Sequence, residues 1–585
     1  MGQSAATAIL LPMREKLQEA IAQVVRELYG QEIQIELARP EPQFGDYATN
    51  VALQIAKQVG KNPREIAEAI AGSVRHRISP IRSIDIAGPG FLNITLTDEA
   101  LYAAAKQDET KPLAGKRVLV EYSDPNPFKP LHAGHLYTTL VGDTIARLVE
   151  RAGAETIRLN YNGDVGRHVG ISMWSIVQYL GGELPEKLAE VSEADRPAWL
   201  GARYVEGTTA FEDDESVKHD ILACNKRVYE VHEQDDHESP FAQIYWTCRQ
   251  WSYDYFPELY RQLQVVPFDR FIPESEVTPL GVATVREQLQ QGVYTESNGA
   301  VVFDGAPHGL HTRVFINSEG LPTYETKDVG LSLTKWQDYQ FDESIIITAN
   351  EQEQYMQVVL KSIEQFAPEP ARRTRHITHG VVKLAGGVKM SSRKGNIVTA
   401  LEILEAAREA GQQSQAKVTE ENMLAAVKYA FAKNRIGGDI AYDPVESIAL
   451  EGNSGPYLQY AHARARSILS RHSGLDPESH SQIAEILKRV QDETGGEVVL
   501  QPDERLLVRK LTEYPEVIAK ATTELMPHHI CTYLYELAQE FNRFYEKNRV
   551  IGDDREALRL GLVETYAKTL KTGLQLLGIQ APERM

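Results

Sequence analysis

Residues 117–161 place an apolar segment, an amphipathic segment and a second apolar segment in succession, and this order restricts the fold more than any other part of the chain. "RVLVEYS" (117–123) and "TIRLNY" (156–161) have the composition of strands, and 136–153 carries apolar side chains at helical spacing. Strand, helix and strand at this distance form a β-α-β crossover, which joins parallel strands. The continuous apolar run at 344–350 is typical of another buried parallel strand. The sequence therefore predicts a doubly wound α/β sheet.

Two further parts are predicted around this sheet. The N-terminal part reads as an α+β domain, with helices expected near 10–29, 48–59 and 64–77 and strands at 32–37 and 90–96. Beyond residue 401 the apolar periodicity is helical almost to the end, apart from a polar stretch at 472–482 that reads as a surface loop. A chain of 585 residues is too long for one hydrophobic core. The predicted division is 1–110, 111–400 with an insertion around 175–270, and 401–585.

Composition excludes several classes of protein. Cys224, Cys248 and Cys531 lie far apart, which argues against a disulfide framework or a zinc ribbon and suits a reducing compartment. The N-terminal segment lacks a basic region followed by an apolar one, so no secretory signal is expected. No apolar run approaches the roughly 18 residues of a membrane span. We expect a soluble, cytoplasmic protein without a membrane segment.

The distribution of charge points to an anion. The net charge of −20 opposes non-specific binding to nucleic acid, but the local distribution of charge decides a site. Residues 370–400 hold seven Lys or Arg and no Asp or Glu. A solvated basic face is the ordinary explanation of such a segment. Its Gly and Ser content favours an anion site instead, because these residues expose backbone N–H groups to phosphate.

His132 and His135 stand between the first predicted strand and the following helix. Ligands of open α/β sheets bind at this edge, and a helix N-terminus offers unpaired N–H groups to a phosphate. Residues three apart share a helix face, so a zinc site and a structural pair are alternatives. The companion ligands of zinc are missing, since H-E-x-x-H and nearby cysteines are absent. Two imidazole donors suit a triphosphate whose α-phosphorus is under attack, with Gly134 leaving room for the nucleotide.

Several segments resemble one family. "HAGH" resembles the HIGH signature of class I aminoacyl-tRNA synthetases, and "KMSSR" (389–393) resembles their KMSKS loop. The flanking text narrows the resemblance to arginyl-tRNA synthetases, through "EYSDPNPFKPLHAGHL", "NYNGDVG", "YETKDVG", "VKMSSRKGN", "GPYLQYAHARARSIL", "FGDYATNVAL" and "LLGIQAPERM". It covers residues 44–585 and is weaker at 175–270 and 472–500. The implied fold is a Rossmann-like catalytic domain of the HIGH superfamily with insertions, an N-terminal α+β appendage and a C-terminal all-α bundle.

The resemblance implies roles toward ATP. His132 and His135 would steady its phosphates, with Gly134 against the nucleoside. The mobile loop that closes on pyrophosphate would comprise Lys389, Met390, Ser391, Ser392 and Arg393. The family motif ends Lys-Ser where this chain has Ser392 and Arg393, so the second lysine is absent. Lys129 resembles the lysine that synthetases with this altered loop place upstream, and would substitute for that cation. Mg²⁺ would accompany ATP, and no protein metal site is expected.

A guanidinium is planar and carries five donors, so an arginine site should offer carboxylates and a hydroxyl or aromatic partner. Tyr324 and Asp328 are four apart, on one face if the segment is helical, and resemble the arginine-gripping pair of the family. Without the resemblance, an exposed polar face is the ordinary explanation of this pair. The matching positions for other arginine contacts are Glu121, Asn126 and Gln352. Which of them meets the guanidinium and which the α-amino group stays open.

The implied reaction is that of an arginine–tRNA ligase. L-arginine and ATP would give arginyl-adenylate and pyrophosphate, and a terminal ribose hydroxyl of tRNA(Arg) would then take the arginyl group. The resemblance also implies that activation requires bound tRNA and that the protein is a monomer. The positions expected to contact tRNA are Phe91 and Asn93 in the N-terminal part and Tyr457, Tyr460 and His462 in the helical part. Core packing is the ordinary explanation of the last three.

Two rival functions and one departure remain. Another nucleotidyl transferase of the superfamily would explain both loops but not the C-terminal helices. A non-catalytic tRNA-binding paralogue would explain the helices but should have lost the histidines or the basic loop. In "GDVGRH" the turn residues Asp164 and Gly166 match the family motif. The family commonly has a glutamine after this turn, whereas this chain has Arg167 and His168. The role of His168 is left open by sequence.

Overall fold

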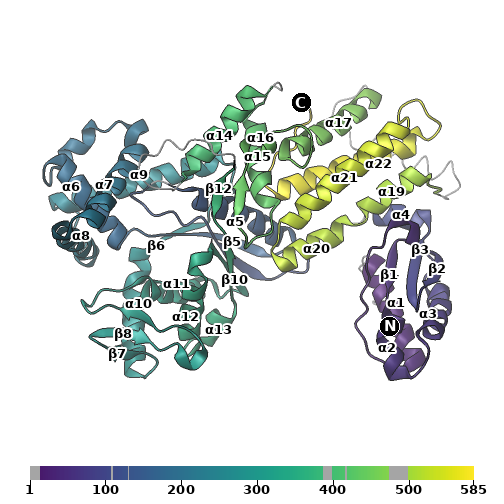
Figure 1. The fold of residues 1–585 in the computed structure, drawn as a ribbon, viewed down its shortest axis with the longest axis horizontal. Helices are drawn as coiled ribbons and strands as arrows, with labels where there is room; N and C mark the ends of the chain where they lie inside the picture. The colour runs from purple at the N-terminus through teal and green to yellow at the C-terminus, as the bar shows by residue number, and fades with distance from the viewer. Residues whose placement is uncertain (1–12, 107–109, 130, 386–397, 415–417, 474–497) are drawn as a thin grey trace, which may run out of the picture.

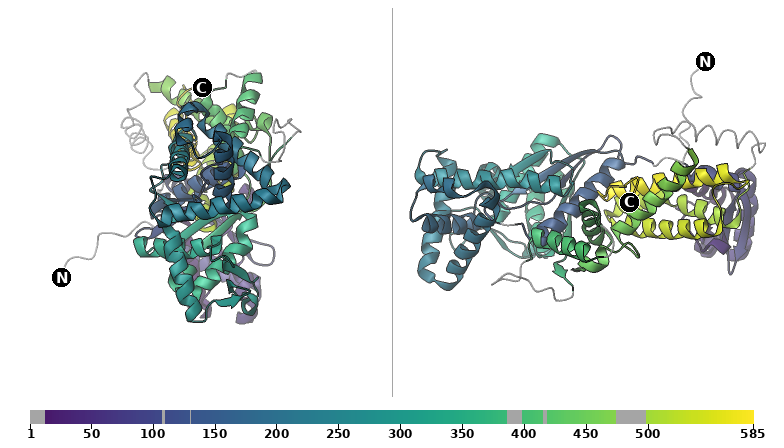
Figure 2. Two further views of the ribbon diagram at one scale, coloured as in Figure 1. Left: turned by 90° about the vertical axis from the view of Figure 1, so that its left-hand side faces the viewer. Right: turned by 90° about the horizontal axis from the view of Figure 1, so that it is seen from above.

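The computed structural model describes residues 13–106, 110–129, 131–385, 398–414, 418–473 and 498–585. Its parts follow one another along the long axis of the molecule (Figure 1). The parallel sheet lies at the centre, the helices of the insertion lie at one end, and the C-terminal helices lead to the N-terminal domain at the other. The same order is visible from above in Figure 2.

The central sheet has the strand order β11-β10-β4-β5-β6, and every neighbouring pair is parallel. Its strands are β4 (Arg117–Glu121), β5 (Glu155–Asn162), β6 (Arg270–Pro273), β10 (Glu343–Ala349) and β11 (Thr374–His379). The chain runs outward from β4 to β5 and β6 on one side and continues with β10 and β11 on the other. The switch point therefore lies between β4 and β10, and the predicted doubly wound sheet is confirmed.

The apolar runs of the sheet are buried on both faces. Val118, Leu119 and Val120 of β4 are at most 1% exposed, and 345–347 of β10 are at most 2% exposed. α5 (Ala133–Arg151) covers β4 and packs closely on it. A Cβ at Gly142 would lie 2.3 Å from the Tyr122 side chain, so only glycine permits this approach. Close packing of α5 on the end of β4 holds the N-terminus of the helix at the switch point.

Helices and a small second sheet extend this central part. The insertion predicted around 175–270 consists largely of helices, with α6 (Arg167–Leu180), α7 (Arg196–Asp213), α8 (Glu215–Glu233) and α9 (Pro240–Gln262). The segment between β6 and β11 adds α10 (Glu274–Gln290), β7 (Thr295–Ser297), β8 (Ala300–Phe303), β9 (Arg313–Ile316), α11 (Tyr324–Tyr339), α12 (Glu353–Glu364) and α13 (Pro368–Arg372). Strands β7, β8 and β9 form an antiparallel sheet.

The N-terminal domain is α+β as predicted, but its strands differ from the expected ones. It comprises α1 (Met13–Tyr29), β1 (Tyr47–Thr49), α2 (Val51–Val59), α3 (Pro63–Arg77), β2 (Ile81–Ala87), β3 (Phe91–Leu96) and α4 (Asp98–Ala104). The strand expected at 32–37 is wrong. Backbone carbonyls of that segment accept hydrogen bonds from side chains of α1 and not from a neighbouring strand. Gln18 donates to Ile35 O at 2.7 Å, and Arg14 donates to Leu37 O at 2.8 Å. Ile35 and Leu37 are buried against the core, which explains the strand-like alternation in the sequence, although the segment pairs with no strand.

The C-terminal part is helical, with one short exception. Its helices are α14 (Ala400–Gln413), α15 (Glu420–Ala432), α16 (Pro444–Ser447), α17 (Gly455–Ser473), α19 (Pro502–Leu511), α20 (Tyr514–Glu524), α21 (His528–Lys547) and α22 (Glu556–Leu576). The exception is β13 (Ile440–Tyr442), which pairs in parallel with β12 (Val382–Leu384). Most of the loop expected at 472–482 lies outside the described residues.

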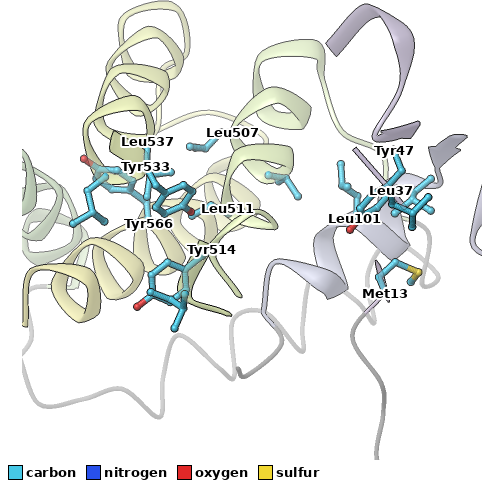
Figure 3. Close-up of a cluster of buried hydrophobic side chains, with 14 of the residues drawn as sticks. Met13, Leu37, Tyr47, Leu101, Leu507, Leu511, Tyr514, Tyr533, Leu537 and Tyr566 are labelled. Atoms are coloured by element: carbon cyan, nitrogen blue, oxygen red, sulfur yellow. The ribbon is translucent and has the colours of Figure 1, made fainter. Parts of the chain in front are cut away.

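One hydrophobic cluster joins the two ends of the chain. Figure 3 shows Met13, Leu37, Tyr47 and Leu101 on the N-terminal side and Leu507, Leu511, Tyr514, Tyr533, Leu537 and Tyr566 among the C-terminal helices. Ion pairs cross the same contact. Glu516 accepts from Arg14 and Arg39, at 2.8 and 2.7 Å, and Arg505 pairs with Asp46 at 2.6 Å. The N-terminal domain is thus attached to the C-terminal helices.

Within the described residues, no helix is long and apolar enough to cross a membrane. The three cysteines are free thiols, two of them buried.

Candidate active site

His132 and His135 form a reciprocal cap at the start of α5. His132 is the N-cap residue, and its Nδ1 accepts from the backbone N–H of His135 at 3.4 Å. Nδ1 of His135 accepts in turn from the backbone N–H of His132 at 3.3 Å. The two rings stack with centroids 3.7 Å apart. The helix start therefore determines the position of both imidazoles.

This cap also determines where the protons of the two rings are. A nitrogen that accepts from N–H carries no proton, so each neutral ring is protonated at Nε2. Burial, and then the charges of Lys129 and His379, lower the pKa of His132 to about 4. Burial lowers the pKa of His135 well below its ordinary value. At neutral pH the site thus offers two neutral Nε2–H donors, suited to the oxygens of a phosphoryl group in a displacement.

Gly134 lies beneath one of these rings. A Cβ at this position would be 2.9 Å from Cε1 and Nδ1 of His132, so any other residue would displace the imidazole. The Gly134 carbonyl accepts from the Thr138 hydroxyl at 2.9 Å, and Thr138 Oγ1 lies 2.7 Å from His379 Nε2. His379 comes from the end of β11, so a second strand supports the turn.

Lys129 lies in the loop between β4 and α5, half-buried, with Nζ 5.4 Å from the centre of the Tyr204 ring. Burial lowers its pKa, and Glu274 opposes that effect. The charge of Lys129 lowers the pKa of His132, His135 and His168, which places the ammonium group near all three rings. A cation beside two neutral donors suits the predicted role toward phosphate.

Four acidic side chains interact near the ends of β4 and β6 and the start of α11, and we call Glu121, Asp124, Glu274 and Asp328 the carboxylate cluster. Two of them are paired with buried lysines. Lys335 Nζ donates to Glu121 at 2.8 Å, and Lys327 Nζ donates to Glu274 at 2.5 Å. All four partners are at most 5% exposed. These two pairs neutralise half of the cluster.

Asp124 and Asp328, the other half, form no ion pair among the described residues. Asp124 accepts from the Tyr161 backbone N–H at 2.7 Å, and Asp328 accepts from the Tyr355 hydroxyl. Burial, and after it the charge of Glu121, raises the pKa of Asp124. Burial also raises the pKa of Asp328 to about 7, although the Tyr355 bond lowers it. When Asp328 is ionised, the cluster thus carries a negative charge that its two lysine pairs do not balance.

Two of the other residues predicted to bind arginine, Tyr324 and Asn126, lie near Glu274 of this cluster. Tyr324 is the first residue of α11, one turn before Asp328, and 51% exposed. Asn126 approaches Gly163 so closely that a Cβ there would be 2.2 Å from Asn126 Oδ1. Gln352 is exposed, in the short 3-10 turn Asn350–Gln352 that follows β10.

The altered "GDVGRH" segment anchors the insertion. Asp164 is buried, pairs with Arg249 of α9 at 2.9 Å and accepts from Ser275 N at 2.9 Å. His168, in the first turn of α6, contacts the Gly163 carbonyl through Nε2 at 2.6 Å and the Tyr324 hydroxyl through Nδ1 at 3.5 Å. The segment therefore reaches the predicted arginine contacts.

Sequence reasoning missed several members of this site. They are Asp124, Glu274, Lys327, Lys335 and Tyr355, while the role of His168 had been left open. Asp124 and Lys327 lie inside quoted motifs, and for Asp124 an acidic residue after a strand was the available signal. The partners of Glu121, Glu274 and Asp328 come from distant parts of the chain, and no pattern in the sequence links them.

Lys389, Met390, Ser391, Ser392 and Arg393, the predicted mobile loop, lie outside the described residues. Four described cations of the basic segment have intramolecular partners. Arg372 pairs with Glu364, Arg373 with Glu369 and Lys383 with Asp439, while Arg375 donates to two backbone carbonyls of α20. For these four cations, an ordinary basic surface is a sufficient explanation. The prediction of an anion site therefore depends on the cations of the loop at 389–393.

The residues predicted to contact tRNA differ in accessibility. Phe91, at the start of β3, is 42% exposed, whereas Asn93 is buried. On α17, Tyr460 is 45% exposed and Tyr457 accepts from Asn542 at 3.0 Å. His462 is fully buried, with Nδ1 2.9 Å from the Pro582 carbonyl. Phe91 and Tyr460 are thus the rings best placed for stacking, and His462 packs against the C-terminal segment.

Comparisons with known proteins agree along the whole chain. A family model described as "tRNA synthetases class I (R), catalytic domain" matches residues 97–453. Models described as "Arginyl tRNA synthetase N terminal domain" and "DALR anticodon binding domain" match 13–96 and 458–585.

Individual proteins resemble the chain over nearly its full length. The arginine–tRNA ligase of Phocaeicola vulgatus is 28% identical, with 98% of this chain and 100% of the relative covered. That of Synechococcus elongatus is 29% identical, with 99% and 100% covered. The structure of Thermus thermophilus arginyl-tRNA synthetase matches with a TM-score of 0.77 at 26% identity, covering 98% of this chain and 100% of that one. The catalytic-domain model spans more than half of the chain, which therefore belongs to the family of class I arginyl-tRNA synthetases.

Proposed function

We propose that this protein is an arginine–tRNA ligase that activates L-arginine with ATP and transfers it to tRNA(Arg). The observation that carries the proposal is the carboxylate cluster, in which Asp328 forms no ion pair among the described residues, together with the two neutral histidine donors at the start of α5. A guanidinium supplies the missing positive charge and donates to carboxylate oxygens in a planar arrangement. The reacting carboxylate of the same amino acid then faces the start of α5.

In the activation step, an oxygen of the arginine carboxylate bonds to the α-phosphorus as the bond from that phosphorus to the bridging oxygen breaks. Pyrophosphate leaves and arginyl-adenylate forms. Nε2–H of His132 and of His135 donate to phosphate oxygens as their charge redistributes, and Lys129 adds a cation. Lys389 and Arg393, with the rest of 389–393, close on the pyrophosphate. Mg²⁺ bound with ATP would screen the phosphate charges.

At the other end of arginine, Asp328, Glu121 and the Tyr324 hydroxyl accept from the guanidinium. Asn126 and Gln352 contact the α-amino group or the carboxylate. No covalent bond to the enzyme forms, because a terminal ribose hydroxyl of tRNA attacks the carbonyl carbon of arginyl-adenylate and AMP leaves.

For the other domains we propose the division at 1–110, 111–400 and 401–585. The N-terminal domain meets tRNA through Phe91 and Asn93, and the C-terminal helices, α17 among them, bind the anticodon region. Bases in loops are read by stacking on exposed rings and by hydrogen bonds to their edges. The protein acts as a cytoplasmic monomer.

Arginine-dependent exchange between ATP and pyrophosphate tests this proposal. The assay should be run with and without cognate tRNA, and with lysine and citrulline in place of arginine. We expect exchange with arginine alone and only when tRNA is present. Exchange with lysine would contradict the assignment of the carboxylate cluster. A folded protein without exchange under any of these conditions would contradict the catalytic function itself.

A further inference from the structure

His168 connects the turn after β5 with the first residue of α11. Its ring is 8% exposed. Nε2 lies 2.6 Å from the Gly163 carbonyl oxygen, and Nδ1 lies 3.5 Å from the Tyr324 hydroxyl oxygen. One imidazole thus has a backbone partner on one side and a residue of the proposed arginine site on the other.

The carbonyl decides which nitrogen carries the proton. A carbonyl oxygen only accepts, so Nε2 must donate to Gly163, and a neutral ring then has its lone pair on Nδ1. The ring is neutral because burial, followed by the charge of Lys129, lowers its pKa to about 3. Nδ1 can therefore only accept, and the Tyr324 hydroxyl is the donor in that contact.

The Tyr324 hydroxyl has a proton to donate. The residue as a whole is half exposed, but its hydroxyl end is desolvated, and this, followed by the charge of Glu274, raises the pKa of Tyr324 to about 12, so the phenol stays protonated at neutral pH. The separation of 3.5 Å is the outer limit of a hydrogen bond. A movement of a few tenths of an ångström on substrate binding completes it, as is common for contacts in active sites.

A substrate guanidinium must bind the Tyr324 hydroxyl through an oxygen lone pair, not through its proton. It carries five N–H donors and no acceptor, so a hydroxyl binds it only with an oxygen lone pair. If the hydroxyl proton points at the substrate, two donors face each other and the contact is lost. An acceptor on the other side of the hydroxyl, which receives the hydrogen bond from its O–H group, removes the conflict.

We propose that His168 is a positioning residue for arginine recognition, which accepts a hydrogen bond from the Tyr324 hydroxyl and leaves a lone pair of that hydroxyl for the guanidinium. The inference rests on the proposed function, since it needs arginine as the substrate and Tyr324 as its contact. His168 itself touches neither arginine nor ATP. Its direction is set in turn by the Gly163 carbonyl.

A double-mutant cycle tests the proposal. We would prepare His168→Phe, Tyr324→Phe and the double variant, and measure KM for arginine and kcat in the exchange assay with tRNA. We expect His168→Phe to raise KM about tenfold with little change in kcat. In the Tyr324→Phe background the same change should leave KM unchanged, because the hydroxyl that His168 orients is gone.

Two further variants separate positioning from packing. His168→Gln should keep KM near that of the unaltered protein, since an amide can both donate to Gly163 and accept from Tyr324. His232→Gln is the matched control, because His232 contacts another tyrosine hydroxyl, that of Tyr245, at 2.7 Å within the insertion. It should leave KM for arginine unchanged. If His168→Phe does not fold, His168→Asn replaces it in the cycle. The Asn side chain is one carbon shorter than that of Gln, so its amide should not reach both Gly163 and Tyr324.

The outcomes distinguish this inference from the proposed function. An equal rise of KM in both backgrounds would show that His168 acts by packing and would overturn the inference, while arginine activation stands. An unchanged KM in folded His168→Phe would also overturn it. Absence of arginine-dependent exchange in the unaltered protein would instead refute the proposed function. An unchanged KM in Tyr324→Phe would refute the Tyr324 contact and the inference with it.

Discussion

Lowering the pH from 8 to 6 should weaken arginine binding about tenfold, through protonation of Asp328. Burial raises the pKa of this carboxyl group to about 7. The protonated form predominates below that value, and it cannot pair with a guanidinium. A group with this pKa is about 90% ionised at pH 8 and about 9% ionised at pH 6, so the competent fraction falls about tenfold.

The assay is isothermal titration of arginine in two buffers with different ionisation enthalpies. Because bound arginine requires the ionised form, binding at pH 6 should release about 0.9 proton, and binding at pH 8 about 0.1 proton. Tyr355→Phe is the matched variant, since the Tyr355 hydroxyl bond lowers the pKa of Asp328. Its loss should move the pH dependence to higher pH.

The same ionisation affects folding with a sign that follows from linkage. Asp328 binds its proton more tightly in the folded state than in the unfolded one, so the free energy of unfolding falls as pH rises between about 4 and about 7. Asp328→Asn should therefore abolish arginine binding and yet raise Tm at pH 8. An arginine affinity that is constant from pH 6 to pH 8, without proton release, would refute this account of the buried carboxyl group.

Three further variants probe the helix start and the buried pairs. His135→Ala should lower kcat of exchange about 100-fold. Because the pKa of His132 is about 4, kcat of the unaltered protein should show no imidazole titration from pH 6 to pH 8. Gly134→Ala, whose Cβ would lie 2.9 Å from the His132 ring, should lower kcat about 100-fold while Tm measured by calorimetry stays unchanged. Lys335→Met leaves Glu121 buried without its cation and should lower the free energy of unfolding in urea by about 3–5 kcal/mol, and Glu121→Gln in the same chain should recover part of it.

The helix start could be predicted because its signals are local. The apolar run of 117–123, the change to helical periodicity at 136 and the position of the histidines between them all lie within one β-α-β unit. The reciprocal cap was not predictable in the same way. Histidine is not among the usual N-cap residues, and the exchange of Nδ1 acceptors between His132 and His135 appears only when both rings are placed.

The charge balance of the site could not be read from the sequence, because its partners are brought together by the sheet. Glu121 and Lys335 are separated by 214 positions, and Glu274 and Lys327 by 53. Tyr324 and Asp328 were predictable as neighbours on one helix face. The hydroxyl of Tyr355, which donates to Asp328, comes from α12, and nothing in the sequence pattern predicts this contact.

The two lysine pairs explain how the carboxylate cluster can select a guanidinium. Lys335 and Lys327 are held by Glu121 and Glu274, and their Nζ atoms are buried within those pairs. They balance the negative charges of Glu121 and Glu274. Burial and the charge of Glu121 favour the protonated form of Asp124, whereas Asp328, with a pKa of about 7, is partly ionised at neutral pH. An ionised carboxylate without a paired cation is unfavourable in a buried setting, so Asp328 should hold either a proton or a substrate cation. A proton can occupy only one oxygen, whereas a planar guanidinium can donate to several acceptors at once. We therefore expect arginine to displace the proton from Asp328, whereas an ammonium group, with its point charge and strong hydration, cannot make the same set of contacts.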